Sequence, residues 1–136
     1  MAKSPEAYVD TSALIALLDR SDTYHALFRQ MFSAPPRLAT TSLVIAEGHG
    51  WFLRRYDRCR ALQFMAMIED MTPLTVFPVG PEEIKGGTAL MRKFKVQDLT
   101  LADAVGLHHM AARKLRQCWS TDFHLGLGGA ALVINQ

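Results

Sequence analysis

Two short apolar runs, one near each end of the chain, are each followed by an aspartate. Ala7–Val9 leads directly into Asp10, and Cys118–Trp119 leads through two hydroxyl residues into Asp122. Both runs have the composition of buried strands. Ligands of open parallel sheets bind outside the carboxyl ends of the strands. If these two strands are neighbours in one parallel sheet, the two aspartates meet at that edge.

Short apolar runs alternate with longer helical patterns along the whole chain. This alternation predicts an α/β fold with a mostly parallel sheet of about five strands. The expected strands are Ala7–Val9, Arg37–Ala39, Leu74–Phe77, Gln117–Ser120 and Ala131–Ile134. The expected helices with both ends assigned are Ser12–Leu18, Asp22–Phe32, Leu43–Tyr56 and Thr100–Leu115, and Thr40-Thr41-Ser42 is the expected cap cluster of the third. Two further helices are expected, one capped by Asp57 and one that begins at Pro81.

The composition is that of an ordinary globular domain. The 136 residues predict one domain over 1–136, and the net charge of +2 permits a nucleic-acid partner without requiring one. Cys59 and Cys118 are the two cysteines, which indicates a reduced, cytoplasmic chain and argues against a structural zinc site. We find no signal peptide and no stretch long and apolar enough to span a membrane.

Two further acids lie within apolar segments that we expect to be helical. Glu47 follows Val44-Ile45-Ala46, and Asp103 ends the segment Thr100-Leu101-Ala102-Asp103. Four acids where a core is expected suggest a carboxylate cluster, and clustered carboxylates repel one another unless protons or metal ions lie among them. We therefore predict a divalent-metal site, for which phosphodiester hydrolysis is the commonest use.

Each acid also has an ordinary structural explanation. Asp10 could cap the following helix, unless Ser12 is the cap and leaves Asp10 free. Asp103 lies at the third position of a capping box, and Asp122 could cap a short turn. Glu47 could be a solvated helix position. The structural and chemical roles can coexist, because the first turn of a helix often faces the crevice at the strand ends.

The four acids lie in segments that follow one another in a specific order. The segments are Tyr8–Leu14, Thr41–Glu47, Leu99–Ala104 and Trp119–His124. In this order they resemble the PIN-domain nucleases over nearly the whole chain, and most closely the VapC-type toxins of type II toxin–antitoxin pairs. All four acids are present, so nothing in the sequence suggests an inactive member.

The resemblance implies a PIN-like α/β/α sandwich whose central sheet has helices on both faces. It further implies that Ser12 and Thr121 support an acidic pocket around Mg²⁺ or Mn²⁺. The acids of that pocket are Asp10, Glu47, Asp103 and Asp122. Members of the family are typically homodimers that cleave RNA and are held inactive by a small VapB-like antitoxin, and no motif in this chain shows either partner independently.

Different roles are expected for the four acids. We expect Asp10 and Asp103 to bind the metal most directly, and Glu47 to bind it through water or to orient the nucleophile. Asp122 would complete the pocket. Mg²⁺ and Mn²⁺ are the expected ions, because hard cations prefer carboxylate oxygen and water.

RNA also needs cations at the rim of an acidic pocket. The candidates are Arg54 and Arg55 in one basic cluster and Arg113 and Arg116 in another. Such clusters are commonly solvated helix faces, and only those that contact phosphates give binding that weakens steeply with salt.

Two other functions compete with a nuclease. A haloacid-dehalogenase-like phosphatase would use Asp10 as its nucleophile, but it requires a second aspartate where this chain has Ser12. A non-catalytic PIN-like module would bind RNA or protein without turnover. Metal-dependent cleavage of RNA by the purified protein, lost when Asp10 is changed, discriminates between the nuclease and the binding module.

Overall fold

The sheet has five strands in the order β3-β2-β1-β4-β5, and each neighbouring pair described is parallel. This computed structural model describes residues 4–135. The strands are β1 (Ala7–Val9), β2 (Leu38–Thr41), β3 (Leu74–Phe77), β4 (Gln117–Trp119) and β5 (Ala131–Leu132). The predicted α/β class and the number of strands are confirmed.

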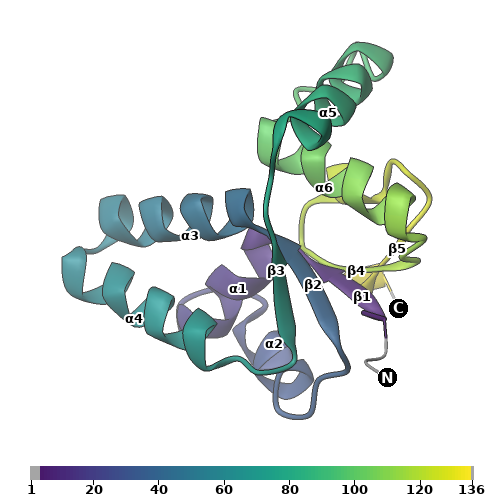
Figure 1. Cartoon of the computed structure of the whole chain (residues 1–136). Coiled ribbons are helices and arrows are strands. Elements are labelled where there is room, and N and C mark those ends of the chain that lie inside the picture. Colours follow the sequence, from purple (N-terminus) through teal and green to yellow (C-terminus); the bar gives the residue numbers. More distant parts are fainter. Residues whose placement is uncertain (1–3, 136) are drawn as a thin grey trace.

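Helices cover both faces of the sheet. Figure 1 shows α1 to α4 on one side and α5 and α6 on the other. The helices are α1 (Thr11–Leu18), α2 (His25–Met31), α3 (Ser42–Arg55), α4 (Arg58–Asp70), α5 (Pro81–Lys93) and α6 (Leu101–Arg113), with 3₁₀ turns η1 (Phe123–Gly126) and η2 (Val133–Asn135). None of these helices has both the length and the apolar character needed to cross a bilayer.

The core lies on both sides of β1 and β4. Successive side chains of a strand point to opposite faces. On one face Tyr8 lies against α6, with its ring 5.7 Å from that of His109. On the other face Trp119 meets Phe32 edge-to-face at 4.9 Å. Burial on both faces explains why these strands are continuous apolar runs rather than alternating ones.

Several predicted boundaries were wrong. α2 begins at His25 rather than Asp22, because the Asp22 carboxylate accepts the N–H of Tyr24 at 2.8 Å and holds the chain in a turn. The second strand extends to Thr41, so the proposed cap cluster lies mostly in β2, and the Thr41 side chain makes no capping bond. The last strand ends at Leu132, where η2 follows.

A close helix–helix contact positions α3, the helix that carries Glu47. Gly48 is buried against the ring of Phe64 on α4, and a Cβ at position 48 would lie 2.3 Å from the ring atom Cζ. Phe64 is itself fully buried and cannot swing into solvent. The small residue that follows Glu47 therefore lets the two helices approach.

We predict that Gly48→Ala lowers the free energy of unfolding by about 1–3 kcal/mol, the usual cost of overpacking a core. The measurement is urea unfolding. Gly50→Ala is the matched control, since a Cβ there meets only the flexible end of Arg54. It should gain up to about 1 kcal/mol from helix propensity. Equal stability of the two variants would contradict the packing argument.

Candidate metal centre at the carboxyl edge of the sheet

Asp10 lies where β1 and β4 are still paired. Val9 is opposite Trp119, and the Asp10 N–H donates to the Trp119 carbonyl at 3.0 Å. The Asp10 side chain caps α1 and accepts from the Ser12 N–H at 3.4 Å and the Ser12 hydroxyl at 2.9 Å. Ser120 Oγ donates to the same carboxylate at 3.0 Å. The capping explanation is therefore correct for Asp10, and Ser12 is not the cap.

The hydrogen bonds to Asp10 all reach one oxygen. Both serine hydroxyls and the Ser12 N–H donate to Oδ2. Among the described residues no donor contacts Oδ1. The residue is only 4% exposed. The orientation of the carboxylate is thus fixed through Oδ2.

Two serines join the strand-end segments to each other. Ser12 Oγ accepts the N–H of Thr121 at 3.0 Å, and Ser120 Oγ accepts the N–H of Asp122 at 2.9 Å. The hydroxyls of the two serines lie 3.1 Å apart. Thr121, a predicted support residue, contributes its backbone N–H, and Ser120, which the sequence offered beside it as a possible support, contributes its hydroxyl. Ser120 is fully buried beside Asp10, and nothing in the sequence indicates this burial.

Asp103 is placed by the capping box that the sequence predicts. Thr100 Oγ1 accepts the N–H of Asp103 at 3.1 Å, and Asp103 Oδ2 accepts the N–H of Thr100 at 3.4 Å. This fixes the first turn of α6. The same carboxylate oxygen lies 4.0 Å from Nδ1 of His124, so the capping group also faces the strand-end segment after β4.

Asp122 and His124 complete the group of possible metal ligands. Asp122 Oδ1 accepts the His124 N–H at 3.0 Å and lies 3.0 Å from the His124 ring Nδ1. Asp103, Asp122 and His124 each offer one ligand atom, and these atoms lie within 4.8 Å of one another. His124 was not among the predicted site residues. Its position two residues after Asp122 is the signal that could have found it.

The acids raise one another's pKa values. Burial is the main cause for Asp103, and together with the charges of Asp122 and Asp10 it raises the pKa of Asp103 to about 6. Burial likewise raises the pKa of Asp10, although hydrogen bonds from Ser12 and Ser120 oppose the rise. The structure thus brings these carboxyl groups close enough to interact strongly.

Glu47 belongs to the same electrostatic group. It lies on the second turn of α3 and is half-buried. Burial, followed by the charges of Asp10 and Asp122, raises the pKa of Glu47, and the Thr11 side chain and the Arg54 guanidinium partly offset the rise. The alternative of a simply solvated helix position does not describe this environment.

The four candidate arginines have different surroundings. The charge of Arg54 lowers the pKa of Glu47, which lies about two turns earlier on α3. Arg55 lies over the ring of Tyr56 at 5.3 Å, and Arg113 lies over that of Phe77 at 3.7 Å. Arg116 is exposed after α6.

The comparisons with known proteins agree with this geometry. The model of the PIN domain matches residues 7–124. The chain belongs to the PIN-domain family. This confirms the resemblance noted in the sequence, and no curated protein sequence matches the chain.

Solved PIN-like structures share the fold at low sequence identity. A sarcin–ricin loop cleaving toxin, VapC20 of Mycobacterium tuberculosis, is 20% identical with a TM-score of 0.84, covering 92% of this chain and 96% of that one. A toxin–antitoxin complex from Klebsiella pneumoniae has a TM-score of 0.64 at 20% identity, with coverages of 93% and 95%. VapBC2 of Rickettsia felis, bound to a promoter DNA fragment, has a TM-score of 0.65 at 10% identity, with coverages of 93% and 95%.

The raised pKa of Asp103 predicts how stability depends on pH. Its folded pKa of about 6 lies above the ordinary value of 3.8, so the folded state binds this proton more tightly than the unfolded chain does. Ionisation therefore removes stability as pH rises from about 4 through 6. In EDTA, Asp103→Asn should unfold at a higher urea concentration than the unchanged protein at about pH 7.5, and the gain should shrink towards pH 4.

The control for this comparison is Asp57→Asn, which removes an exposed helix-capping carboxylate outside the cluster. That variant should show no such gain. An Asp103→Asn protein no more stable than the original at the higher pH would contradict the proposed repulsion.

Proposed function

We propose that this protein is a divalent-metal-dependent endoribonuclease, the toxin of a toxin–antitoxin pair. The observation that carries the proposal is the group formed by Asp10, Glu47, Asp103 and Asp122. Burial raises the pKa values of the first three, and the charges of neighbouring acids add to the rise at Glu47 and Asp103. Such a pocket is unfavourable by itself and is relieved by a cation. Oxygen ligands suit Mg²⁺ and Mn²⁺.

The residues present fit such an ion. Asp10 would offer its unengaged oxygen Oδ1, and Asp103 would bind from the first turn of α6. Asp122 would complete the set, with one oxygen held by His124. A bound divalent ion would make a water more nucleophilic and stabilise the charge on the leaving oxygen of a phosphodiester.

The chain's own groups would position the reaction. The hydroxyls of Ser12 and Ser120 fix the rotation of the Asp10 carboxylate through two hydrogen bonds. Glu47 has a raised pKa at the mouth of the pocket and would orient or deprotonate the attacking water. Arg54 lies about two turns further along α3, where its charge lowers the pKa of Glu47, and it would attract the phosphate of the substrate.

The proposal extends to partners and cellular setting. Solved structures with the same fold are toxins or toxin–antitoxin complexes, which supports a small VapB-like antitoxin as partner. RNA is the proposed substrate and a homodimer the proposed assembly, both from the family resemblance. Two free cysteines favour a reducing cytoplasm.

A binding module without turnover is the alternative function. It would keep the same fold and use the acids for a structural ion. The hydrogen bonding of Asp10 favours the enzyme, because one oxygen is oriented by two hydroxyls and the other is left unengaged. A structural ion has no need of such an arrangement in a crevice.

We predict that Asp10→Asn lowers metal-dependent RNA cleavage by more than about 100-fold, because removing one charged active-site group typically costs that much. The assay is cleavage of a mixed RNA pool with Mg²⁺, with Mn²⁺ and with EDTA. Asp98→Asn is the matched control, since Asp98 is an exposed loop carboxylate. Near-normal cleavage by Asp10→Asn, or cleavage in EDTA, would overturn the proposed mechanism.

Ser120→Ala should weaken metal binding rather than unfold the protein. Loss of a hydrogen-bond partner of a metal ligand typically costs about 10–100-fold in affinity. The measurement is the Mn²⁺ concentration needed for half-maximal cleavage, which should rise by that factor. Ser33→Ala, at an exposed serine that bonds only to the Gln30 carbonyl, should leave it unchanged. An unaltered Mn²⁺ requirement in Ser120→Ala would remove Ser120 from the site.

A further inference from the structure

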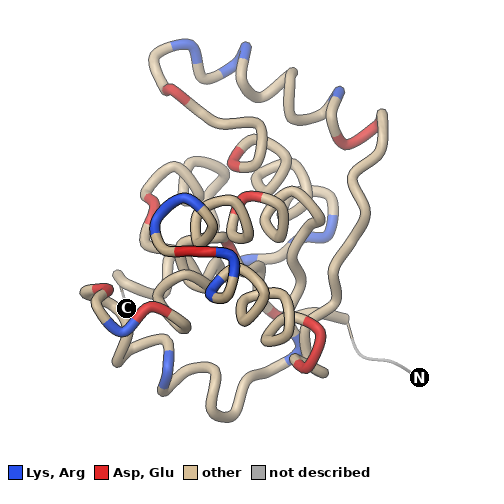
Figure 2. The backbone as a smooth tube through the Cα atoms, turned by 90° about the vertical axis from the view of Figure 1, so that its left-hand side faces the viewer, with Lys and Arg blue, Asp and Glu red and all other residues tan. Residues whose placement is uncertain are grey.

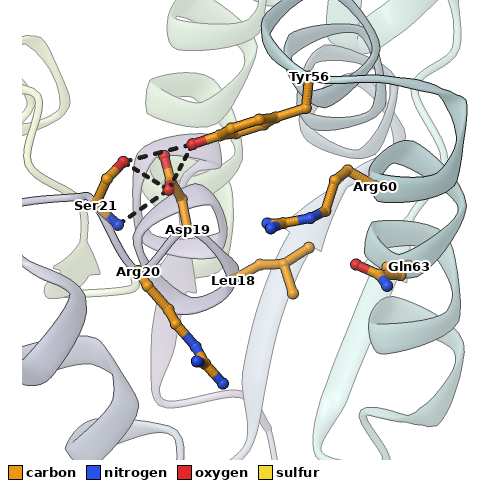
Figure 3. Close-up of a pocket in the computed structure, with 7 residues that line it drawn as sticks. All are labelled: Leu18, Asp19, Arg20, Ser21, Tyr56, Arg60 and Gln63. Atoms are coloured by element: carbon orange, nitrogen blue, oxygen red, sulfur yellow. Dashed lines mark hydrogen bonds between the residues drawn. The ribbon is translucent and has the colours of Figure 1, made fainter.

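A second pocket lies at the opposite end of α1 from the carboxylates. The loop after α1 faces the turn between α3 and α4 across a cavity of about 420 Å³. Its lining includes Leu18, Arg20, Tyr56, Arg60 and Gln63. Figure 3 shows Arg60 and Gln63 reaching from α4 towards Leu18, with Arg20 extending from the loop on the other side. The cavity combines cationic, amide and aromatic groups.

A buried aspartate holds this pocket in shape. Asp19 is 6% exposed and accepts hydrogen bonds from the Tyr56 hydroxyl at 2.9 Å, the Ser21 hydroxyl at 2.7 Å and the Ser21 N–H at 3.1 Å. Burial would raise the pKa of Asp19, but these hydrogen bonds and the charge of Arg55 keep it below its usual value. The carboxylate is thus occupied in fixing the Tyr56 ring against the loop.

Asp19 also lines the pocket, but the two arginines form no ion pair with it. Within residues 4–135 neither Arg20 nor Arg60 forms an ion pair. The guanidinium carbon of Arg60 lies 5.0 Å from the centre of the Tyr56 ring, which restrains its position. A planar guanidinium presents paired donors that match a phosphate or a carboxylate. Two of them beside the Gln63 amide make a pocket for an anion.

The second pocket and the carboxylate site lie at opposite ends of α1. Asp10 caps the start of α1 and Asp19 caps its end. Their backbones are therefore about 14 Å apart at 1.5 Å per residue. A stacked nucleic-acid strand covers that distance in about four nucleotides, at 3.4 Å each. α3 runs in contact with α1 and carries Glu47 on its second turn and Arg54 on its last turn.

The basic residues between the two sites form a connected group. The charge of Arg54 lowers the pKa of Glu47, and the charge of Arg55 lowers that of Asp19. Arg55 also lies 5.3 Å from the centre of the Tyr56 ring, which itself lines the pocket. Figure 2 shows basic residues on the turn between α3 and α4, which faces the viewer. A polyanion leaving the carboxylate site can follow these cations to the second pocket.

We propose that the pocket formed by Arg20, Tyr56, Arg60 and Gln63 binds a backbone phosphate of the RNA strand, about four nucleotides from the bond that is cut. The proposal rests on the proposed nuclease function for the direction of the strand. Tyr56 is 37% exposed, and the guanidiniums of Arg55 and Arg60 lie over its ring at 5.3 Å and 5.0 Å, so its part in the pocket is to hold these cations. The pocket would add affinity for long substrates and would play no part in the chemical step.

RNA is favoured over an acidic protein segment as the occupant. Arg54, Arg55 and Arg58 extend the positive charge beyond the pocket, as a continuous polyanion requires. A single glutamate or aspartate of a protein would use the pocket alone. The double variant Arg20→Gln/Arg60→Gln removes both guanidiniums and leaves the Asp19 network in place.

The first test is RNA binding, measured by fluorescence anisotropy in EDTA with a labelled single strand of about 12 nucleotides, at several salt concentrations. The double variant should bind more weakly. Its slope of log Kd against log salt should fall by about 0.7 if both arginines hold one phosphate, or about 1.4 if they hold two. The control Arg29→Gln/Arg37→Gln makes the same charge change at exposed positions outside the pocket and should keep the original slope.

The second test is cleavage of two substrates of different length. The double variant should lose activity on the long strand and keep kcat/KM on a trinucleotide, which cannot span both sites. An unchanged salt slope would overturn the phosphate pocket even if cleavage is normal. If the unchanged protein cleaves no RNA, the nuclease proposal fails, while a reduced salt slope would still support the pocket.

Competition with a polyglutamate peptide separates the two possible occupants. The peptide should displace RNA weakly, and equally from the original protein and the double variant. The contrary result is that the peptide displaces RNA better than unlabelled RNA of equal length does, and only when Arg20 and Arg60 are present. That result would assign the pocket to an acidic protein segment and overturn the RNA assignment. Melting temperatures of both variants establish that they are folded.

Discussion

The parallel pairing of β1 with β4 is the contact on which the candidate site depends. It persists to the last residue of each strand, so the Asp10 N–H still donates to the Trp119 carbonyl. Ser120 is thereby held beside Asp10, and the segment that follows carries Asp122 and His124 into the same space. The aromatic contact of Trp119 with Phe32 and the packing of Tyr8 against α6 secure this pairing from both faces. Without the pairing, two acids remote in sequence would not meet.

Helix capping holds the carboxylates close together although burial and their like charges oppose this arrangement. Asp10, Asp103 and Asp122 each accept a backbone N–H at the start of a helix or 3₁₀ turn. These bonds, together with the positive ends of the helices, stabilise carboxylates in positions where burial and like charge oppose them. At Asp103 the effects of burial and like charge still exceed those of the hydrogen bonds, and they raise its pKa to about 6. The remaining repulsion is the electrostatic basis on which we propose that the site binds a cation.

Strand-end reasoning predicted the convergence of Asp10 with Asp122, because it requires only that two apolar strands be parallel neighbours. The capping box of Asp103 was also predictable from four consecutive residues. The sequence offered Ser120 as a possible support and His124 as a histidine in suitable spacing, but it assigned neither a site role, since their roles depend on which side chains are buried beside which. The start of α2 was misplaced because the Asp22 side chain competes locally with the helix. The pocket at Arg20 and Arg60 requires the approach of α1 to the α3–α4 turn, and no spacing in the sequence indicates that approach.

The central claim is that the carboxylates at the edge of the sheet hold a divalent cation. The most direct measurement is anomalous X-ray diffraction from crystals grown with Mn²⁺. The account predicts an anomalous peak bounded by Asp10, Asp103 and Asp122, with Glu47 nearby, that disappears in Asp10→Asn crystals. A map of well-diffracting crystals with no Mn²⁺ among these acids, or with the ion bound elsewhere, would contradict it.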